Sequence, residues 1–130
     1  MKGYIENIEM LTRANEYYRK VLYTDERLQL VLMTLKPGEE IGAETHQLDQ
    51  FIRVEEGEGT AILDGAESTI GDGSVVIVPQ GVRHNIINTS ATDALKLYTL
   101  YAPPNHEPGT IHETKTEADA DDEHYGHESA

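Results

Sequence analysis

Two short segments of the sequence contain residue types that bind metal ions. In the first, Glu44 and His46 lie two positions apart, and Gln50 follows four positions after His46. In the second, His84 lies in a segment rich in β-branched residues. Side chains two apart on a strand point to the same face, and a turn over residues 47–49 would bring Gln50 in from an adjoining strand. Two imidazole nitrogens and two side-chain oxygens converging inside a barrel suit a divalent transition metal.

The elements that must position these residues are expected to be short strands. Gly and Pro interrupt the apolar runs about every eight to twelve residues, which is typical of an all-β sandwich or barrel. Asp64-Gly65 predicts a tight hairpin turn, and a weak helical pattern predicts a short helix near residues 8–18. The expected strands are residues 17–24, 28–36, 51–55, 60–63, 67–70, 75–78, 83–88 and 95–101.

Composition excludes several classes of function. The chain has 130 residues, enough for one domain, and its 24 acidic and 10 basic residues give a formal net charge of −14. That charge argues against nucleic acid and against anionic membranes as partners. The absence of Cys excludes disulfides, thiolate metal sites and Cys nucleophiles. No apolar run approaches the ~20 residues of a membrane span, and the first residues carry no apolar signal segment, so we expect a cytoplasmic protein.

Much of the acidic charge is concentrated in the C-terminal part of the sequence. Residues 107–130 contain eight Asp or Glu residues and a single base, Lys115. The last 17 residues have little apolar surface with which to offset the entropy of ordering. We therefore expect a barrel with N-terminal strands over residues 1–112, followed by an acidic tail over residues 113–130. This tail would be either mobile or a loosely attached short helix.

Four further histidines offer weaker candidates for function. Two of them, His106 and His112, are expected to be exposed to solvent, although both could fold over the mouth of a barrel. The other two, His124 and His127, fall in the acidic tail, where they could bind metal nonspecifically. None of the four shares the paired spacing of the first two segments.

The spacing in the two metal-binding segments resembles the two motifs of the cupin superfamily. The first segment, from Gly38 to Gly57, is similar to Gly-x5-His-x-His-x3-4-Glu-x6-Gly. The second matches every fixed position of Gly-x5-Pro-x-Gly-x2-His-x3-Asn, with Gly73, Pro79, Gly81, His84 and Asn88. The resemblance covers about residues 36–100. It implies a double-stranded β-helix, or jelly-roll, barrel, which commonly holds a divalent metal by three His and one Glu.

The first segment departs from the cupin pattern at two ligand positions. Glu44 stands where the motif usually has His, and Gln50 stands where it usually has Glu. The two changes compensate in charge, because one carboxylate remains. The resemblance therefore implies a re-tuned metal site at Glu44, His46, Gln50 and His84, and the oxygen-richer set favours Zn, Mn, Fe, Ni or Co over Cu. The same ligand types resemble those of type I phosphomannose isomerases, which are zinc cupins, although Gln and Glu are exchanged in order.

Several functions are compatible with such a site. The favoured one is an isomerase- or epimerase-like reaction on a small polar molecule, with the metal as Lewis acid. The alternatives are a metal-dependent dioxygenase, a non-catalytic small-molecule binding or sensing cupin, and a structural barrel without metal. No independent catalytic base can be named, and the acidic surface disfavours phosphorylated substrates unless Arg or Lys lines the pocket. The resemblance also implies a homodimer, formed by strand addition through the apolar residues 17–33.

Overall fold

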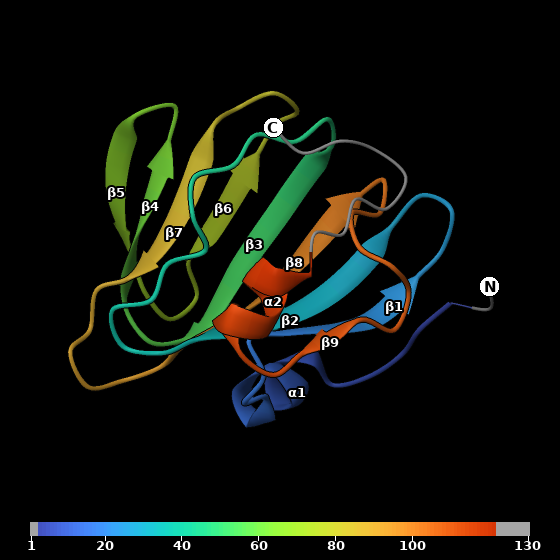
Figure 1. The fold of residues 1–130 in the computed structure, drawn as a ribbon, viewed down its shortest axis with the longest axis horizontal. Helices are drawn as coiled ribbons and strands as arrows, with labels where there is room; N and C mark the ends of the chain where they lie inside the picture. The colour runs from blue at the N-terminus through green and yellow to red at the C-terminus, as the bar shows by residue number, and fades with distance from the viewer. Residues whose placement is uncertain (1–2, 122–130) are drawn as a thin grey trace.

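The computed structural model describes residues 3–121, which form two antiparallel β-sheets facing each other (Figure 1). The elements are α1 (Ile8–Ala14), β1 (Arg19–Thr24), β2 (Gln29–Leu35), β3 (Asp49–Glu56), β4 (Gly59–Leu63), β5 (Ala66–Ile70), β6 (Val75–Val78), β7 (His84–Asn88), β8 (Leu95–Ala102), β9 (Ile111–His112) and α2 (Lys115–Ala120). The larger sheet has the order β6-β3-β8-β2-β1-β9 and the smaller sheet β5-β4-β7. This architecture confirms the predicted all-β, jelly-roll fold class.

The strands lie where the turn residues in the sequence predict them. Each of the eight expected strands is present, and its ends differ from the prediction by at most two residues. At the β4–β5 hairpin, Asp64 and Gly65 both have positive φ, 50° and 83°, as a turn that follows the twist of the strands requires. The N-terminal helix ends at Ala14 rather than near residue 18, because Asn15 caps it in an extended conformation.

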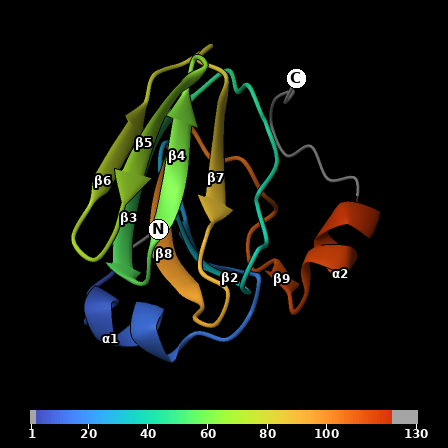
Figure 2. The same cartoon turned by 90° about the vertical axis from the view of Figure 1, so that its left-hand side faces the viewer.

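The segment between β2 and β3 extends the smaller sheet. Isolated bridges join Glu40 to Ile87 and Glu44 to His84, so this segment runs antiparallel beside β7 (Figure 2). It does not form a continuous strand, but it gives β7 a partner on its free side. A functional side chain on this segment is therefore held by backbone hydrogen bonds to the smaller sheet.

The hydrophobic core fills the space between the two sheets. Alternate residues of β2, β3 and β8 point inward, and Leu35, Ile52 and Leu97 are fully buried. The smaller sheet contributes Ala61 and Ile86 to the same cluster. Burial of apolar surface, which contributes roughly 25 cal/mol per Å², is the main term that stabilises the barrel.

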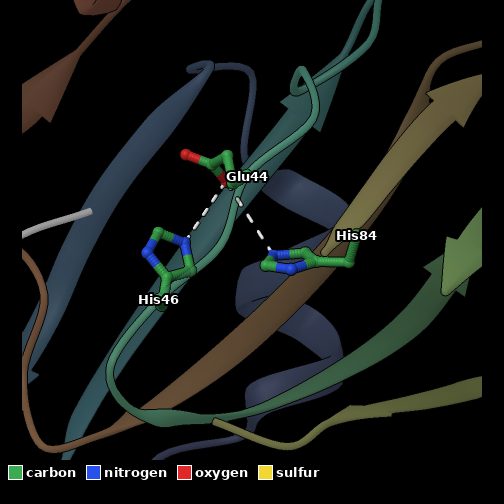
Figure 3. Close-up of side chains that lie close together, drawn as sticks. All are labelled: Glu44, His46 and His84. Atoms are coloured by element: carbon green, nitrogen blue, oxygen red, sulfur yellow. Dashed lines mark ion pairs between the residues drawn. The ribbon is translucent and has the colours of Figure 1, made fainter. Parts of the chain in front are cut away.

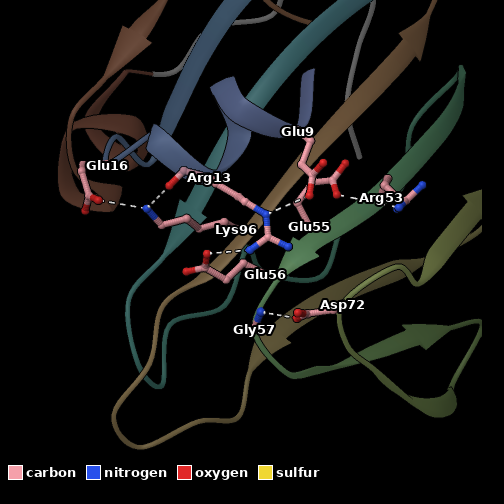
Figure 4. A network of polar contacts seen from close by, with 9 residues as sticks. All are labelled: Glu9, Arg13, Glu16, Arg53, Glu55, Glu56, Gly57, Asp72 and Lys96. Atoms are coloured by element: carbon pink, nitrogen blue, oxygen red, sulfur yellow. Dashed lines mark hydrogen bonds and ion pairs between the residues drawn. The ribbon is translucent and has the colours of Figure 1, made fainter. Parts of the chain in front are cut away.

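Helix α1 is attached to the larger sheet by polar contacts (Figure 4). Arg13 forms an ion pair of 3.0 Å with Glu56 at the end of β3. The Lys96 ammonium on β8 donates to the carbonyl of Arg13 at 2.7 Å and to the carboxylate of Glu16 at 2.9 Å. These contacts hold α1 across one end of β3 and β8.

Residues 111–121 return to the barrel instead of leaving it. Strand β9 pairs with β1, and Ala118 of α2 packs against the core cluster. Helix α2 is thus the short helix expected as one of two outcomes for this region. His124 and His127 lie outside the described residues, and the domain boundary at residue 112 stays a prediction. Among residues 3–121, no helix is long and apolar enough to cross a membrane.

Candidate metal centre

Glu44 and His84 are placed opposite each other by backbone pairing. The Glu44 amide donates to the His84 carbonyl and the His84 amide donates to the Glu44 carbonyl, both at 2.9 Å. This reciprocal exchange is the hydrogen-bonded pair of an antiparallel ladder, which sets two side chains side by side on one face. Residues 40 positions apart in the sequence therefore share one site.

His46 reaches the same site because it lies two residues beyond Glu44. Its carbonyl accepts a hydrogen bond of 2.9 Å from the amide of Gly81, which is one of the fixed glycines of the second motif. The His46 ring is buried and lies 5.3 Å from the His84 ring, centroid to centroid. The edge-on ring of Tyr101 packs on it at 6.2 Å.

The three side chains converge on one point, as Figure 3 shows. Glu44 Oε1 lies 3.4 Å from His46 Nε2 and 4.0 Å from His84 Nε2. One donor atom from each residue lies within 4.8 Å of the other two. Ligand atoms bound about 2.1 Å from a tetrahedral ion are separated by about 3.4 Å, so a small contraction of this triangle fits a divalent metal.

The protonation of His84 suits metal binding. Its Nδ1 lies 3.0 Å from the Val82 carbonyl, which can only accept, so Nδ1 carries the hydrogen and Nε2 carries the lone pair. Nε2 is buried and has no hydrogen-bond partner among the described residues. Burial lowers the pKa of His84, although the Val82 carbonyl and Glu44 act in the opposite direction. The imidazole therefore stays neutral at neutral pH, the form that binds a metal.

Gln50, the fourth predicted ligand, presents a buried side-chain oxygen. Its side chain is buried on the inner face of β3, as the alternation with Ile52 predicts. The Nε2 group donates to Thr99 Oγ1 at 3.0 Å, while Oε1 is buried with no hydrogen-bond partner among residues 3–121. A buried acceptor without a partner is costly, and a cation would satisfy it.

Thr99 is expected to act on metal affinity through Gln50. The change Thr99→Val keeps the shape but removes the acceptor that orients the Gln50 amide, so we expect metal affinity to fall by about tenfold. The matched control is Thr34→Val, which removes buried hydrogen bonds to Asn15 away from the site. Competition titration with a chromophoric chelator measures both. Equal affinity in the two variants would contradict a role for Gln50 in metal binding.

A cavity of about 160 Å³ lies at the mouth of the barrel and reaches Glu44. Its walls come from the start of β1, the segment before β3, the loop after β8, strand β9 and helix α2. The lining residues are Tyr18, Arg19, Ile41, Glu44, Asn105, His106, His112, Ala118, Asp119 and Asp121. A small molecule in this cavity would contact the carboxylate of Glu44.

The expectation that His106 and His112 are exposed is wrong. They are only 8% and 5% exposed, respectively. The backbone of His106 is held by the buried side chain of Gln29, and its ring meets Tyr101 edge-on at 5.4 Å. His112 is buried because β9 pairs with β1, which the sequence pattern did not reveal.

Helix α2 is joined to the barrel through His112. Asp121, at the end of α2, lies 2.8 Å from His112 Nε2, and Arg19 Nη1 lies 3.0 Å from His112 Nδ1. A guanidinium can only donate, so Nδ1 accepts and Nε2–H donates to Asp121. This chain of hydrogen bonds keeps α2 beside the cavity.

Sequence reasoning missed Tyr18 in the cavity region and left open whether Tyr101 lines the barrel. Tyr18 is buried in the cavity wall, and burial raises its pKa to about 12. Tyr101 lies between His46 and His106, and burial raises its pKa as well. Both phenols therefore remain protonated and uncharged at neutral pH. Strand parity allows only one of Tyr98 and Tyr101 to face inward, but the sequence does not show which end of the barrel holds the cavity.

Residues 31–101 match the family model described as cupin domain, and they make up more than half of the chain. The chain therefore belongs to the cupin family, as the two motifs predicted. Its fold and its Glu/His/His group agree with that membership.

The chain is also similar to individual proteins of other organisms. It is 43% identical over 124 residues to the uncharacterised protein YrkC of Bacillus subtilis (strain 168), covering 90% of this chain and 66% of YrkC. It is 45% identical over 112 residues to the uncharacterised protein L612 of Acanthamoeba polyphaga mimivirus, covering 83% of this chain and 70% of L612. The crystal structure of BH2720 from Bacillus halodurans superposes with a TM-score of 0.89 at 41% identity, covering 92% of this chain and 96% of that one. The chain thus spans just under two thirds of YrkC.

Proposed function

We propose that this cupin binds one divalent metal ion through Glu44, His46, Gln50 and His84. The observation that carries the proposal is the convergence of three donor atoms within 4.8 Å, from two buried histidines and the half-buried Glu44. The available Oε1 of Gln50 and the lone pair of His84 Nε2 support it. With two nitrogen and two oxygen ligands, the set suits Zn, Mn, Fe, Ni or Co better than Cu.

The proposed reaction is an isomerisation or epimerisation of a small polar molecule. The bound ion would supply a Lewis acid that polarises a carbonyl oxygen. His106 is the proposed base, because it lines the same cavity as Glu44. The Asn105 side chain lies 3.4 Å from His106 Nε2 and helps to hold the ring in the cavity wall. The buried, protonated Tyr101 lies beside His46 and His106.

Exchange of substrate hydrogen with solvent tests the reaction class. Metal-loaded protein in D₂O is incubated with two- to four-carbon hydroxyaldehydes, hydroxyketones and hydroxy acids, and proton NMR follows the carbon next to the carbonyl. We expect deuterium incorporation that falls at least about 100-fold in His106→Ala, the scale of general base catalysis. Oxygen uptake without exchange would instead support the dioxygenase alternative. Ligand binding with neither would support the binding or sensing alternative.

The proposal includes a homodimer in the cytoplasm. Addition of a strand along residues 17–33 is restricted, because β1 already pairs with both β2 and β9. The outer face of the larger sheet is the better surface, since Val75 and Ile77 on its edge strand are 52% and 54% exposed. We expect light scattering to give twice the chain mass, and Ile77→Lys to give the mass of one chain. A monomeric mass for the unaltered protein would contradict the dimer.

A further inference from the structure

Arg19 is a buried cation in the wall of the candidate site. On β1 it shares the inward face with Val21, whereas Lys20 between them is partly exposed. Arg19 is only 9% exposed and lines the same 160 Å³ cavity as Glu44. An inward-facing arginine is unusual in a chain of net charge −14, because a buried charge needs a partner.

The contacts of Arg19 leave part of its guanidinium unsatisfied. Nη1 meets His112 Nδ1 at 3.0 Å, and the group lies 5.2 Å from the centre of the Tyr18 ring. Its Nε is buried and has no hydrogen-bond partner in the described part of the chain. Asp121, at the end of α2, lines the same cavity but accepts from His112 instead. Among residues 3–121, no carboxylate forms an ion pair with Arg19.

We propose that Arg19 binds the carboxylate of a small hydroxy or oxo acid, which is the substrate or ligand of this cupin. The inference rests on the proposed metal site, because the hydroxyl or carbonyl oxygen of the same molecule would face that site. A guanidinium recognises a carboxylate by charge-assisted hydrogen bonds, and Nε is one of the donors that it uses. A ligand carboxylate in the cavity would meet the guanidinium that lines it and give Arg19 the anionic partner that no described carboxylate supplies.

The volume of the cavity indicates the size of ligand that it suits. A cavity of about 150 Å³ in another protein holds benzene, which has about six non-hydrogen atoms. The cavity beside Arg19 has a similar volume of about 160 Å³. The cavity volume therefore suits an acid of about three or four carbons.

The charges around the cavity favour a single negative charge on the ligand. A divalent ion, Glu44 and Arg19 together would make the inner end positive, whereas Asp119 and Asp121 make the α2 side negative. A phosphate monoester, which is close to doubly charged at neutral pH, would be repelled more strongly by those two carboxylates than a monocarboxylate.

Calorimetric titration of the full chain with L-lactate and with L-lactamide tests the inference. The two probes have the same shape, but only lactate has a carboxylate. With zinc-loaded protein, we expect Arg19→Met to weaken lactate binding by at least about tenfold and to change lactamide binding by less than about twofold. The matched control is Arg53→Met. Arg53 forms an ion pair of 3.7 Å with Glu55 on β3 (Figure 4), and it lies away from the cavity. Equal lactate affinity in Arg19→Met and the unaltered protein would overturn the inference.

A second readout does not depend on the variant folding. In the ¹⁵N NMR spectrum of the unaltered protein, the Nε–H resonance of Arg19 should shift on addition of lactate but not of lactamide. The same experiment on metal-free protein distinguishes the carboxylate inference from the proposed metal site. If zinc binds at the four ligands but lactate does not shift the Arg19 resonance, the carboxylate inference alone is overturned. Failure of zinc to bind, with lactate still shifting Arg19, would overturn the metal site alone.

Discussion

Replacement of His84 by Ala is expected to reduce the metal content of the purified, untagged full chain from about one ion to below about a tenth of an ion. His84 contributes an imidazole that is already fixed by the Val82 carbonyl and kept neutral by burial. Its removal leaves two anchored ligands and Gln50, too few to hold a divalent ion through purification. Plasma mass spectrometry measures the ratio directly.

The matched control for this variant is His106→Ala. His106 is also buried and lines the cavity, but it is outside the Glu44, His46 and His84 group. The His106→Ala variant should retain the metal content of the unaltered protein. The histidines of the C-terminal segment are present in both variants. Thermal unfolding checks the fold. Metal at 100 times its Kd should raise the free energy of unfolding of the control by about 2.7 kcal/mol and leave that of His84→Ala unchanged. Equal metal content in both variants would contradict the proposed ligand set.

The second large effect is expected on folding, from Gly57→Ala. Gly57 joins β3 to β4 with φ of +109°, a conformation that side chains rarely adopt. A Cβ at this position would lie 2.5 Å from the carbonyl oxygen of Ala94. The Gly57 amide also donates to Asp72 at 2.8 Å, so the backbone cannot move away freely (Figure 4). We expect the free energy of unfolding to fall by more than about 3 kcal/mol.

Gly73→Ala separates the clash from the backbone strain. Gly73 also has a positive φ, 85°, but a Cβ there would meet nothing within 4 Å. Its cost should be the strain alone, about 1–2 kcal/mol. Urea unfolding of both variants gives the comparison. A loss for Gly57→Ala that does not exceed the loss for Gly73→Ala would show that the close approach to Ala94 does not matter.

The sequence was most informative where local chemistry decides the structure. Turn residues such as Asp64-Gly65 determine their own backbone angles, so the strand boundaries follow from them. The paired spacing of Glu44 and His46 likewise survives in the structure, because two residues along an extended segment restore the same facing.

The parts that sequence reasoning missed depend on contacts between distant segments. Strand parity places Arg19 with Val21, but only the return of β9 shows that His112 lies beside it. The burial of His106 depends in the same way on Gln29, which is 77 residues away in the chain. No local pattern carries such pairings, because they arise from the packing of the whole barrel.

Anomalous diffraction from crystals grown with zinc would test the central claim most directly. The account predicts one strong peak inside the barrel, about 2.0–2.2 Å from Glu44, Gln50 and the Nε2 atoms of His46 and His84. A strong peak held by other residues, or no peak at these four while zinc is present in the crystal, would contradict the proposed metal centre.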